Sequence, residues 1–266
     1  MTSNRLMPAS LLVILLGTAA CQTAPIANSG FLADYDQLQT RDDTLRASIR
    51  QRRDEAAVAS IDQVWLEPTV LIGDAGEGLS DADRALVLRE VDRQVCYEIS
   101  ERFTLSATPQ DVALVRTAIV DIGQTGAAGS GLSAVANALI PGPGTFRVPG
   151  TTGGLAAEAE LLDSRGMQVA ALAWARNANV VGTDTPSLSR VGDALQMAEP
   201  FGDAVGDAFA SADRPVRPIP EPDPCQRFGP RSQPGGFLTR LVTGLYVPEV
   251  NTGSREEAPT AETPRP

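Results

Sequence analysis

The strongest constraint on the fold is a pair of alternating runs joined by a short polar turn. In "LAAEAELLD" (155–163) small and apolar residues alternate with Glu158 and Glu160, and "MQVAALAWARNA" (167–178) follows the turn "SRG". Period-two alternation is typical of a strand with one buried face, and two such runs around a Gly-containing turn predict a β-hairpin. We expect the face that holds the two glutamates to carry charge, so that helices cover only the opposite face.

Two more strands and a helix are expected before the hairpin. Residues 61–73, "IDQVWLEPTVLIG", alternate like a strand that Pro68 interrupts, because proline cannot donate a ladder hydrogen bond. Ser80, with Asp83 three positions later, predicts the start of an amphipathic helix. Residues 111–123 are rich in β-branched and apolar side chains, which indicates a second strand.

A closing helix is predicted over 188–209, where apolar side chains recur at helical spacing and Pro200 should introduce a kink. The expected architecture is an α+β domain over residues 61–212 in the order β-α-β-β-β-α. It has two helices on one face of a four-stranded mixed sheet. Residues 213–266 hold eleven of the chain's twenty prolines, and we expect them to form an extended, partly disordered tail.

The first twenty residues have the pattern of a bacterial export signal. Arg5 precedes the apolar run 11–16, and small residues follow it. The apolar stretch is shorter than the ~20 residues that a membrane-spanning helix needs, so we expect residues 1–20 to be removed. Cys21, after "GTAA", resembles a lipobox cysteine that receives a diacylglyceryl group; the alternative is ordinary cleavage that leaves a free thiol. Residues 21–60 are then expected to be a tether, an apolar segment at 30–39 that docks on the body, and a solvated connector over 41–60.

These features imply a location and a disulfide. A lipid on Cys21 would hold the protein at a membrane, and Gln22 in place of aspartate resembles lipoproteins sorted to the outer membrane. We therefore expect an outer-membrane anchor and a protein body in the periplasm. In that oxidising compartment Cys96 and Cys225 are expected to pair. The bridge would close about 130 residues and contribute up to about 4–5 kcal/mol; two unpaired buried thiols are the alternative.

Composition excludes several classes of chemistry. The chain has no histidine, and all 22 of its basic residues are arginine. It therefore lacks a Ser-His-Asp or Cys-His pair, a His-ligated zinc site and the lysine of a phosphate-binding loop. A net charge of −11 argues against nucleic-acid binding. We expect no enzymatic activity, no cofactor and no metal site; a hydrolase that uses carboxylates is the remaining enzymatic alternative.

Two segments are candidates for partner contact. The Gly-rich stretch 123–154 contains no phosphate-binding glycine motif. It is expected to be either a flexible excursion or a mobile apolar flap that touches a partner or a lipid. In the tail, residues 235–250 are either a cap on the body or a partner-binding helix. The candidate contact residues are Leu132, Val135, Leu139 and Ile140 in the first segment and Phe237, Leu241 and Leu245 in the second.

Several stretches together carry a family resemblance. They are, in order, Cys21, "SGFLADYDQL" (29–38), "VWLEPTVLI" (64–72), "GLSAVANALIPG" (131–142) and "LAAEAELLDSRGMQVAALAWAR" (155–176). Over about residues 29–212 the chain resembles a family of bacterial lipoproteins known only as domain of unknown function 3313. The resemblance implies the location and the fold class but no catalytic residue. The pair Cys96 and Cys225 and the Pro-rich tail look like departures from the family.

The expected function is a non-enzymatic interaction or assembly module of the cell envelope, held at the membrane by its lipid and bound to an unidentified envelope protein. The alternative is a carrier that binds a small apolar ligand or lipid between sheet and helices, because the small Ala-rich interior of 155–175 could leave a cavity.

Overall fold

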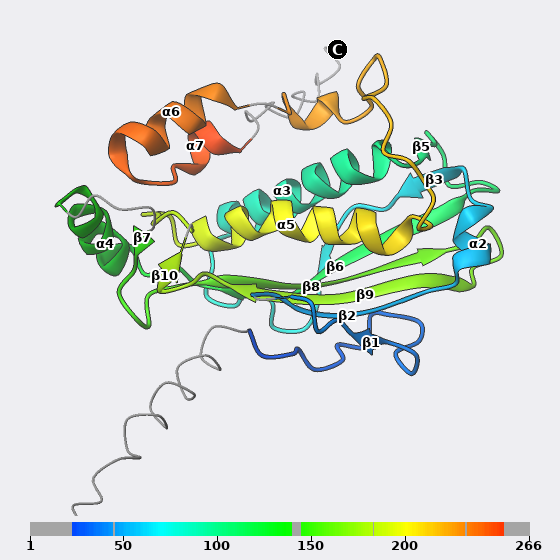
Figure 1. Cartoon of the computed structure of the whole chain (residues 1–266), viewed down its shortest axis with the longest axis horizontal. Helices are drawn as coiled ribbons and strands as arrows, with labels where there is room; N and C mark the ends of the chain where they lie inside the picture. Colours follow the sequence, from blue (N-terminus) through cyan, green and yellow to red (C-terminus); the bar gives the residue numbers. More distant parts are fainter. Residues whose placement is uncertain (1–22, 45, 140–144, 183, 232, 253–266) are drawn as a thin grey trace, which may run out of the picture.

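An eight-stranded mixed sheet forms the centre of the protein (Figure 1). The computed structural model describes residues 23–44, 46–139, 145–182, 184–231 and 233–252. The strands follow one another across the sheet in the order β1-β2-β9-β8-β6-β3-β5, and β4 also pairs with β6. Their bounds are β1 Gln39–Thr40, β2 Ser48–Arg53, β3 Gln63–Leu66, β4 Val70–Leu71, β5 Thr104–Leu105, β6 Ala113–Gly123, β8 Gly154–Leu162 and β9 Gln168–Asn177. A separate two-stranded sheet pairs β7 (Thr145–Phe146) with β10 (Val181–Gly182).

The predicted hairpin is confirmed as the antiparallel pair β8–β9, and the α+β class with a mixed sheet is confirmed. The expected number of four strands is wrong. Pro68 splits the first expected strand into β3 and β4, which both pair in parallel with β6. Two of the additional strands, β1 and β5, have only two residues each, too few to show a period.

The remaining additional strand, β2, lies within the stretch that we expected to be a solvated connector. Its sequence "SIRQRR" pairs antiparallel with β9 from Ser48 opposite Ala175 to Arg53 opposite Ala170. The sequence did not indicate this strand, because three of its six residues are arginine and only one is apolar. A run of charged residues is usually a solvated segment. The body of the protein therefore includes residues before 61.

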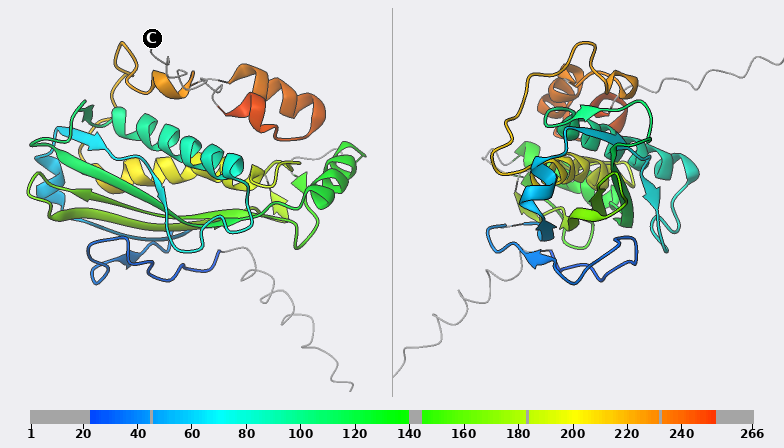
Figure 2. Two further views of the ribbon diagram at one scale, coloured as in Figure 1. Left: turned by 180° about the vertical axis from the view of Figure 1, so that it is seen from behind. Right: turned by 90° about the vertical axis from the view of Figure 1, so that its right-hand side faces the viewer.

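Two long helices cover one face of the sheet, as expected (Figures 1 and 2). They are α3 (Asp81–Ser100) and α5 (Gly192–Phe209), and the Ser80 hydroxyl caps α3 by accepting from the Asp83 N–H at 3.1 Å. The rings of Trp174 on β9 and Phe201 on α5 lie 5.6 Å apart in the core between sheet and helix. The other helices are α2 (Glu55–Ala59), α4 (Ala127–Leu139), α6 (Pro234–Thr243) and α7 (Pro248–Asn251).

Glycines allow α3 and α5 to pack closely. A Cβ atom at Gly202 would lie 2.9 Å from the backbone carbonyl carbon of Gln94, and one at Gly206 would lie 3.1 Å from the Cβ of Glu98. Such distances are shorter than side-chain carbons tolerate, so the two helices meet at a spacing that only glycine permits at these positions.

The C-terminal tail returns to α3, as the expected disulfide requires, and side-chain contacts also hold it there. Cys96 and Cys225 form a disulfide with their Cα atoms 5.9 Å apart, which places the tail over the helix. The Arg214 guanidinium donates to the Ile61 carbonyl at 2.5 Å and lies 4.5 Å from the centre of the Phe103 ring. Arg231 pairs with Glu101 at 3.2 Å. Contacts between side chains that are distant in the chain, such as those of Arg214 and Arg231, could not be predicted from the composition of this segment.

The substitution Gly202→Ala should destabilise the protein, because the added methyl group meets the Gln94 backbone and the helices must separate. We expect a loss of about 1–3 kcal/mol in the free energy of unfolding, measured by urea denaturation. Gly235→Ala on α6 is the matched control, since a Cβ there meets nothing within 4 Å. An equal effect of the two substitutions would contradict the close packing of α3 and α5.

Candidate functional site

The outer face of the sheet, opposite the helices, holds two fully buried glutamates. Glu158 and Glu160 on β8 are 0% exposed, whereas we expected this face to be a charged one left uncovered. The N-terminal segment crosses this face beneath β8 and β9 (Figure 1). We call residues 23–36 the N-terminal strap. Burial of a carboxylate requires hydrogen bonds or an ion pair, and the strap supplies many of them.

Tyr35 organises the middle of the strap. Its hydroxyl donates to Glu158 Oε2 at 2.6 Å and accepts from the backbone N–H groups of Gly30 and Leu32 at 2.9 and 3.1 Å. The Ser29 hydroxyl donates to the same carboxylate at 2.5 Å. The loop 29–35 is thus closed around one phenol oxygen and fastened to one buried carboxylate.

Glu160 is held by both the sheet and the strap. Arg116, which lies directly opposite on β6, donates to Glu160 at 2.6 Å, and Ala33 N–H donates to it at 2.8 Å. The Phe31 ring covers the guanidinium of Arg116, with 4.9 Å between the ring centre and the central carbon. The apolar docking that we expected of 30–39 is therefore accompanied by a polar network.

The start of the strap is also bound to the body. Thr23 donates its N–H to the Arg46 carbonyl at 3.2 Å, and its hydroxyl accepts from the Asn177 N–H at 2.9 Å. Arg50 on β2 donates to the Ile26 carbonyl at 3.1 Å. We expected this part of the chain to be a tether, yet from Thr23 onward it is fixed along the sheet. Cys21 itself lies outside the described residues.

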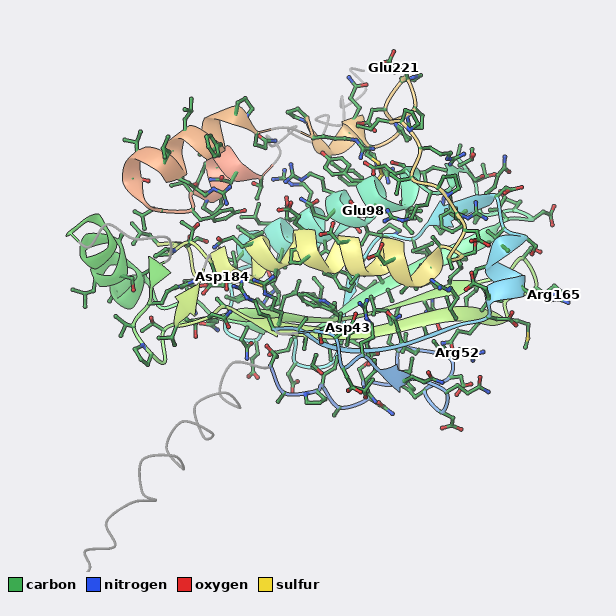
Figure 3. The ribbon with its side chains drawn as sticks, in the orientation of Figure 1. Asp43, Arg52, Glu98, Arg165, Asp184 and Glu221 are labelled. Atoms are coloured by element: carbon green, nitrogen blue, oxygen red, sulfur yellow. A yellow bond between two sulfur atoms is a disulfide. The ribbon has the colours of Figure 1, made fainter. Side chains whose placement is uncertain are left out.

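On the opposite side of the molecule, a cleft of about 630 Å³ lies between the helix pair and the C-terminal tail. Figure 3 shows two residues that line it, Glu98 and Asp184, at different positions along the helix layer. The lining is rich in charged side chains from α3, α5 and the tail. They include Glu90, Arg93, Glu98, Glu101, Arg176, Asp184, Glu199, Asp203, Arg231 and Arg240.

Arginine donors in the cleft are incompletely used. Arg93, 4% exposed, pairs with Glu90 through Nη2 at 2.6 Å, but its Nε and Nη1 have no partner among the described residues. Arg176 pairs with Asp184 at 2.6 Å, and its Nε likewise has no described partner. Burial raises the pKa of Glu90 against the opposing effect of Arg93. Buried donors without acceptors are costly, and because these nitrogens are themselves closed to solvent, the folded protein bears that cost.

The acidic side of the cleft is strained by like charges. Burial, together with the charges of Glu98 and Glu199, raises the pKa of Asp203 to about 6. The pKa of Tyr246, which follows α6 within the tail and is almost fully buried, is also raised, first by burial and then by the charge of Glu90.

Among the contact residues that the sequence predicted and the structure describes, only Phe237 lines the charged cleft. Leu132 on α4 is 67% exposed, and Phe237 and Leu241 on α6 are 60% and 71% exposed. Phe237 also lines the cleft, and Leu245 is half-buried. Ile140 lies outside the described residues, as do the side chains of Val135 and Leu139.

Sequence reasoning placed Tyr35 in the docking segment, but it did not foresee the hydrogen bonds by which its hydroxyl closes the strap, or the arginines of the cleft. The one available signal was the placement of two glutamates on the same face of an otherwise apolar hairpin.

In the part of the chain that the structure describes, no helix has the length and apolar character to cross a bilayer. The same part contains no group of three or more Cys, Asp or Glu residues arranged to hold a metal ion.

Tyr35→Phe should release the strap, because it leaves the buried Glu158 carboxylate with one donor fewer. We expect a loss of about 1–3 kcal/mol and faster amide hydrogen exchange in residues 23–36. Tyr97→Phe is the matched control, since the Tyr97 hydroxyl donates to the Gly229 carbonyl in the tail at 3.1 Å. Faster exchange of the strap in both variants, or in neither, would contradict this role of Tyr35.

Asp203→Asn should stabilise the protein above neutral pH. The pKa of Asp203 is about 6 in the folded protein, whereas an aspartate in the unfolded chain has a pKa of about 4. The stability that this group contributes is therefore lost as the pH rises from about 4 through about 6.

The side chain is partly exposed, so we expect the gain at pH 8 to be at most about 1 kcal/mol and to shrink at pH 4.5 in thermal melts. Asp213→Asn, at another exposed aspartate, serves as the control. A gain for Asp203→Asn that does not change with pH would rule out this titration.

The fold and these sites can be set beside known proteins. Two solved structures of the PelC dodecamer from Paraburkholderia phytofirmans, one of them a point variant, are similar to this chain with a TM-score of 0.37 each. Their identities to this chain are 12% and 8%, and each match covers 63% of this chain and 99% of the other. No curated protein matches the chain.

A family model described as "Protein of unknown function (DUF3313)" matches residues 27–205. The match begins inside the strap and ends within α5, so it takes in most of the strap, the buried glutamates and the whole eight-stranded sheet. The tail and its disulfide partner Cys225 lie beyond it. The chain therefore belongs to the DUF3313 family.

Proposed function

We propose that the chain is an outer-membrane-anchored periplasmic lipoprotein that acts as a non-enzymatic interaction or assembly module of the cell envelope. The export-signal pattern and the small residues before Cys21 support the anchor. The disulfide between Cys96 and Cys225 is consistent with an oxidising compartment. The anchor would receive its diacylglyceryl group on Cys21, and the partner would be another envelope protein.

An apolar ridge on α6 is the observation that carries the proposal. Phe237, Leu238, Leu241 and Val242 lie on one side of this helix and are 60%, 57%, 71% and 83% exposed. Neighbouring exposed apolar side chains of this size are characteristic of an interaction surface. The helix that carries this ridge is fixed by contacts with α7 and with the body of the protein.

Two contacts position α6. Gly236 packs so closely on the α7 end that an added Cβ would lie 2.4 Å from the Asn251 side-chain oxygen. Tyr246, just after the helix, is buried, and its carbonyl accepts from the Ser187 hydroxyl at 2.8 Å. A helix held by such contacts while its apolar side is exposed is suited to bind a partner.

The cleft adjoins this ridge, because Phe237 belongs to both. An apolar centre beside a polar, charged rim is the arrangement found in protein–protein interfaces. Arg240, an exposed residue of the cleft lining, would meet an acceptor on the partner, such as a backbone carbonyl or a carboxylate. We therefore propose that the partner contributes an apolar segment flanked by such acceptors.

The alternatives have weaker support. Most acids of the cleft are paired with arginine, as Glu90 is with Arg93 and Glu101 with Arg231, which suits a structural or binding role better than proton transfer. A carrier of a small apolar ligand would need space between sheet and helices. Trp174, Phe201 and Phe209 fill that layer and are at most 1% exposed.

The test is photocrosslinking in cells of the native host with p-benzoylphenylalanine in place of Leu241. We expect a reproducible adduct with one envelope protein, identified by mass spectrometry after extraction in detergent. Arg165, on the turn between β8 and β9 and 82% exposed, is the matched position for the same probe and should give no such adduct. Absence of a protein adduct at 241, or a lipid adduct there, would count against this surface as a protein-binding site.

A further inference from the structure

We infer that the uncharged end of the molecule around α4 rests on the surface of the membrane that holds the lipid anchor. This inference rests on the proposed lipid at Cys21. It commits the Gly-rich excursion to a lipid surface and leaves the ridge on α6 to a protein partner.

The first argument is the short distance between the anchor and the body. Only Gln22 separates Cys21 from Thr23, which is hydrogen-bonded to Arg46 and Asn177. Two residues span at most about 7 Å of extended chain. A lipid on Cys21 would therefore hold Thr23 and its contacts against the headgroups, with too little free chain for the body to turn away.

The second argument is the position of α4 relative to that point. Asn177 ends β9 opposite Gly154, and the next residue, Ala178, donates its N–H to the Gly153 carbonyl at 2.9 Å. A Cβ at Gly153 would lie 3.0 Å from the Thr125 nitrogen, two residues before α4 begins. The base of α4 is therefore connected to the docking point of Thr23 by adjacent backbone contacts, and Figure 1 shows α4 protruding at one end of the long axis.

The third argument is charge. Residues 122–157 contain a single charged residue, Arg147, in a chain of which 21% is charged. Arg147 is completely buried and is neutralised by Asp193, with 2.9 Å between Nη2 and Oδ2. The rest of the acidic chain is repelled by an anionic lipid surface, whereas this stretch is not. Two exposed charges of opposite sign border this stretch: Arg190 donates to Gln124 at 2.6 Å, and the backbone carbonyl of Glu77 accepts from Gln124 at 3.2 Å.

The fourth argument is the surface that this end presents. The thirteen residues of α4 include no charged side chain, and Leu132 on it is 67% exposed. Leu188, 55% exposed, is next to α4, since its Cδ2 would be 3.9 Å from a Cβ at Gly131. Exposed leucines on an uncharged helix suit shallow burial at the boundary between headgroups and acyl chains.

Fluorescence quenching in vesicles tests the inference. The full lipidated chain carries Trp65→Phe to remove one native indole, while the other, Trp174, is buried in the core. Leu132→Trp or Arg165→Trp then supplies the probe, and the protein is reconstituted into phosphatidylcholine and phosphatidylglycerol vesicles with or without brominated acyl chains. Arg165 is the control because it lies at the far end of the sheet from α4 (Figure 3).

We expect brominated lipid to cause a loss of fluorescence from the probe at 132 and none from the probe at 165. Leu188→Trp provides a second probe on the same end, should Leu132→Trp fail to fold. Intact mass of the same samples reports the lipid on Cys21. Lipid on Cys21 without quenching at 132 or 188, or with equal quenching at 165, would overturn the membrane contact and leave the lipoprotein proposal standing. Absence of lipid from Cys21 in protein purified from the native host would overturn the proposed function itself.

Discussion

Burial of two carboxylates on the outer face of the hairpin is the constraint around which the protein is arranged. Glu158 and Glu160 can lie without solvent only because donors surround them. Arg116 supplies one from the neighbouring strand, and Ser29, Ala33 and Tyr35 supply others from the strap. Without the strap these carboxylates would face water, so the N-terminal segment is an integral layer of the fold. The layer order is strap, sheet, helix pair and tail.

This arrangement couples the proposed anchor to the rest of the molecule. A flexible tether would let the body turn freely above a membrane, whereas a strap bound from Thr23 onward gives the body one orientation. The uncharged end with α4 then lies beside the lipid. The cleft is lined by α3, α5 and the tail, and Figure 1 shows these elements across the sheet from the strap. In the proposed function, attachment and recognition therefore occupy separate faces of the molecule.

The candidate site shows both the reach and the limit of reasoning from a single sequence. Exposure of Leu132, Phe237 and Leu241 agrees with their selection from apolar spacing in segments that lack a strand or core pattern. The cleft could not be foreseen, because its lining comes from α3, α5 and the tail, which are far apart in the chain. Arg93 on a helix with many charges resembles any solvated arginine until the tail covers it.

The sequence alone determined the hairpin and both long helices, because these depend on local period. The pairing of Cys96 with Cys225 followed from the cysteine count and the expected compartment, and the family from the resemblance of several stretches. Tertiary structure decided the number of strands, since β2 becomes a strand only by pairing with β9. It also decided that Glu158 and Glu160 are buried. Alternation places a side chain on one face of a sheet, but it does not say whether water or another segment covers that face. Here a distant segment does, because a tyrosine hydroxyl, a serine and backbone N–H groups match the acceptors that the sheet presents.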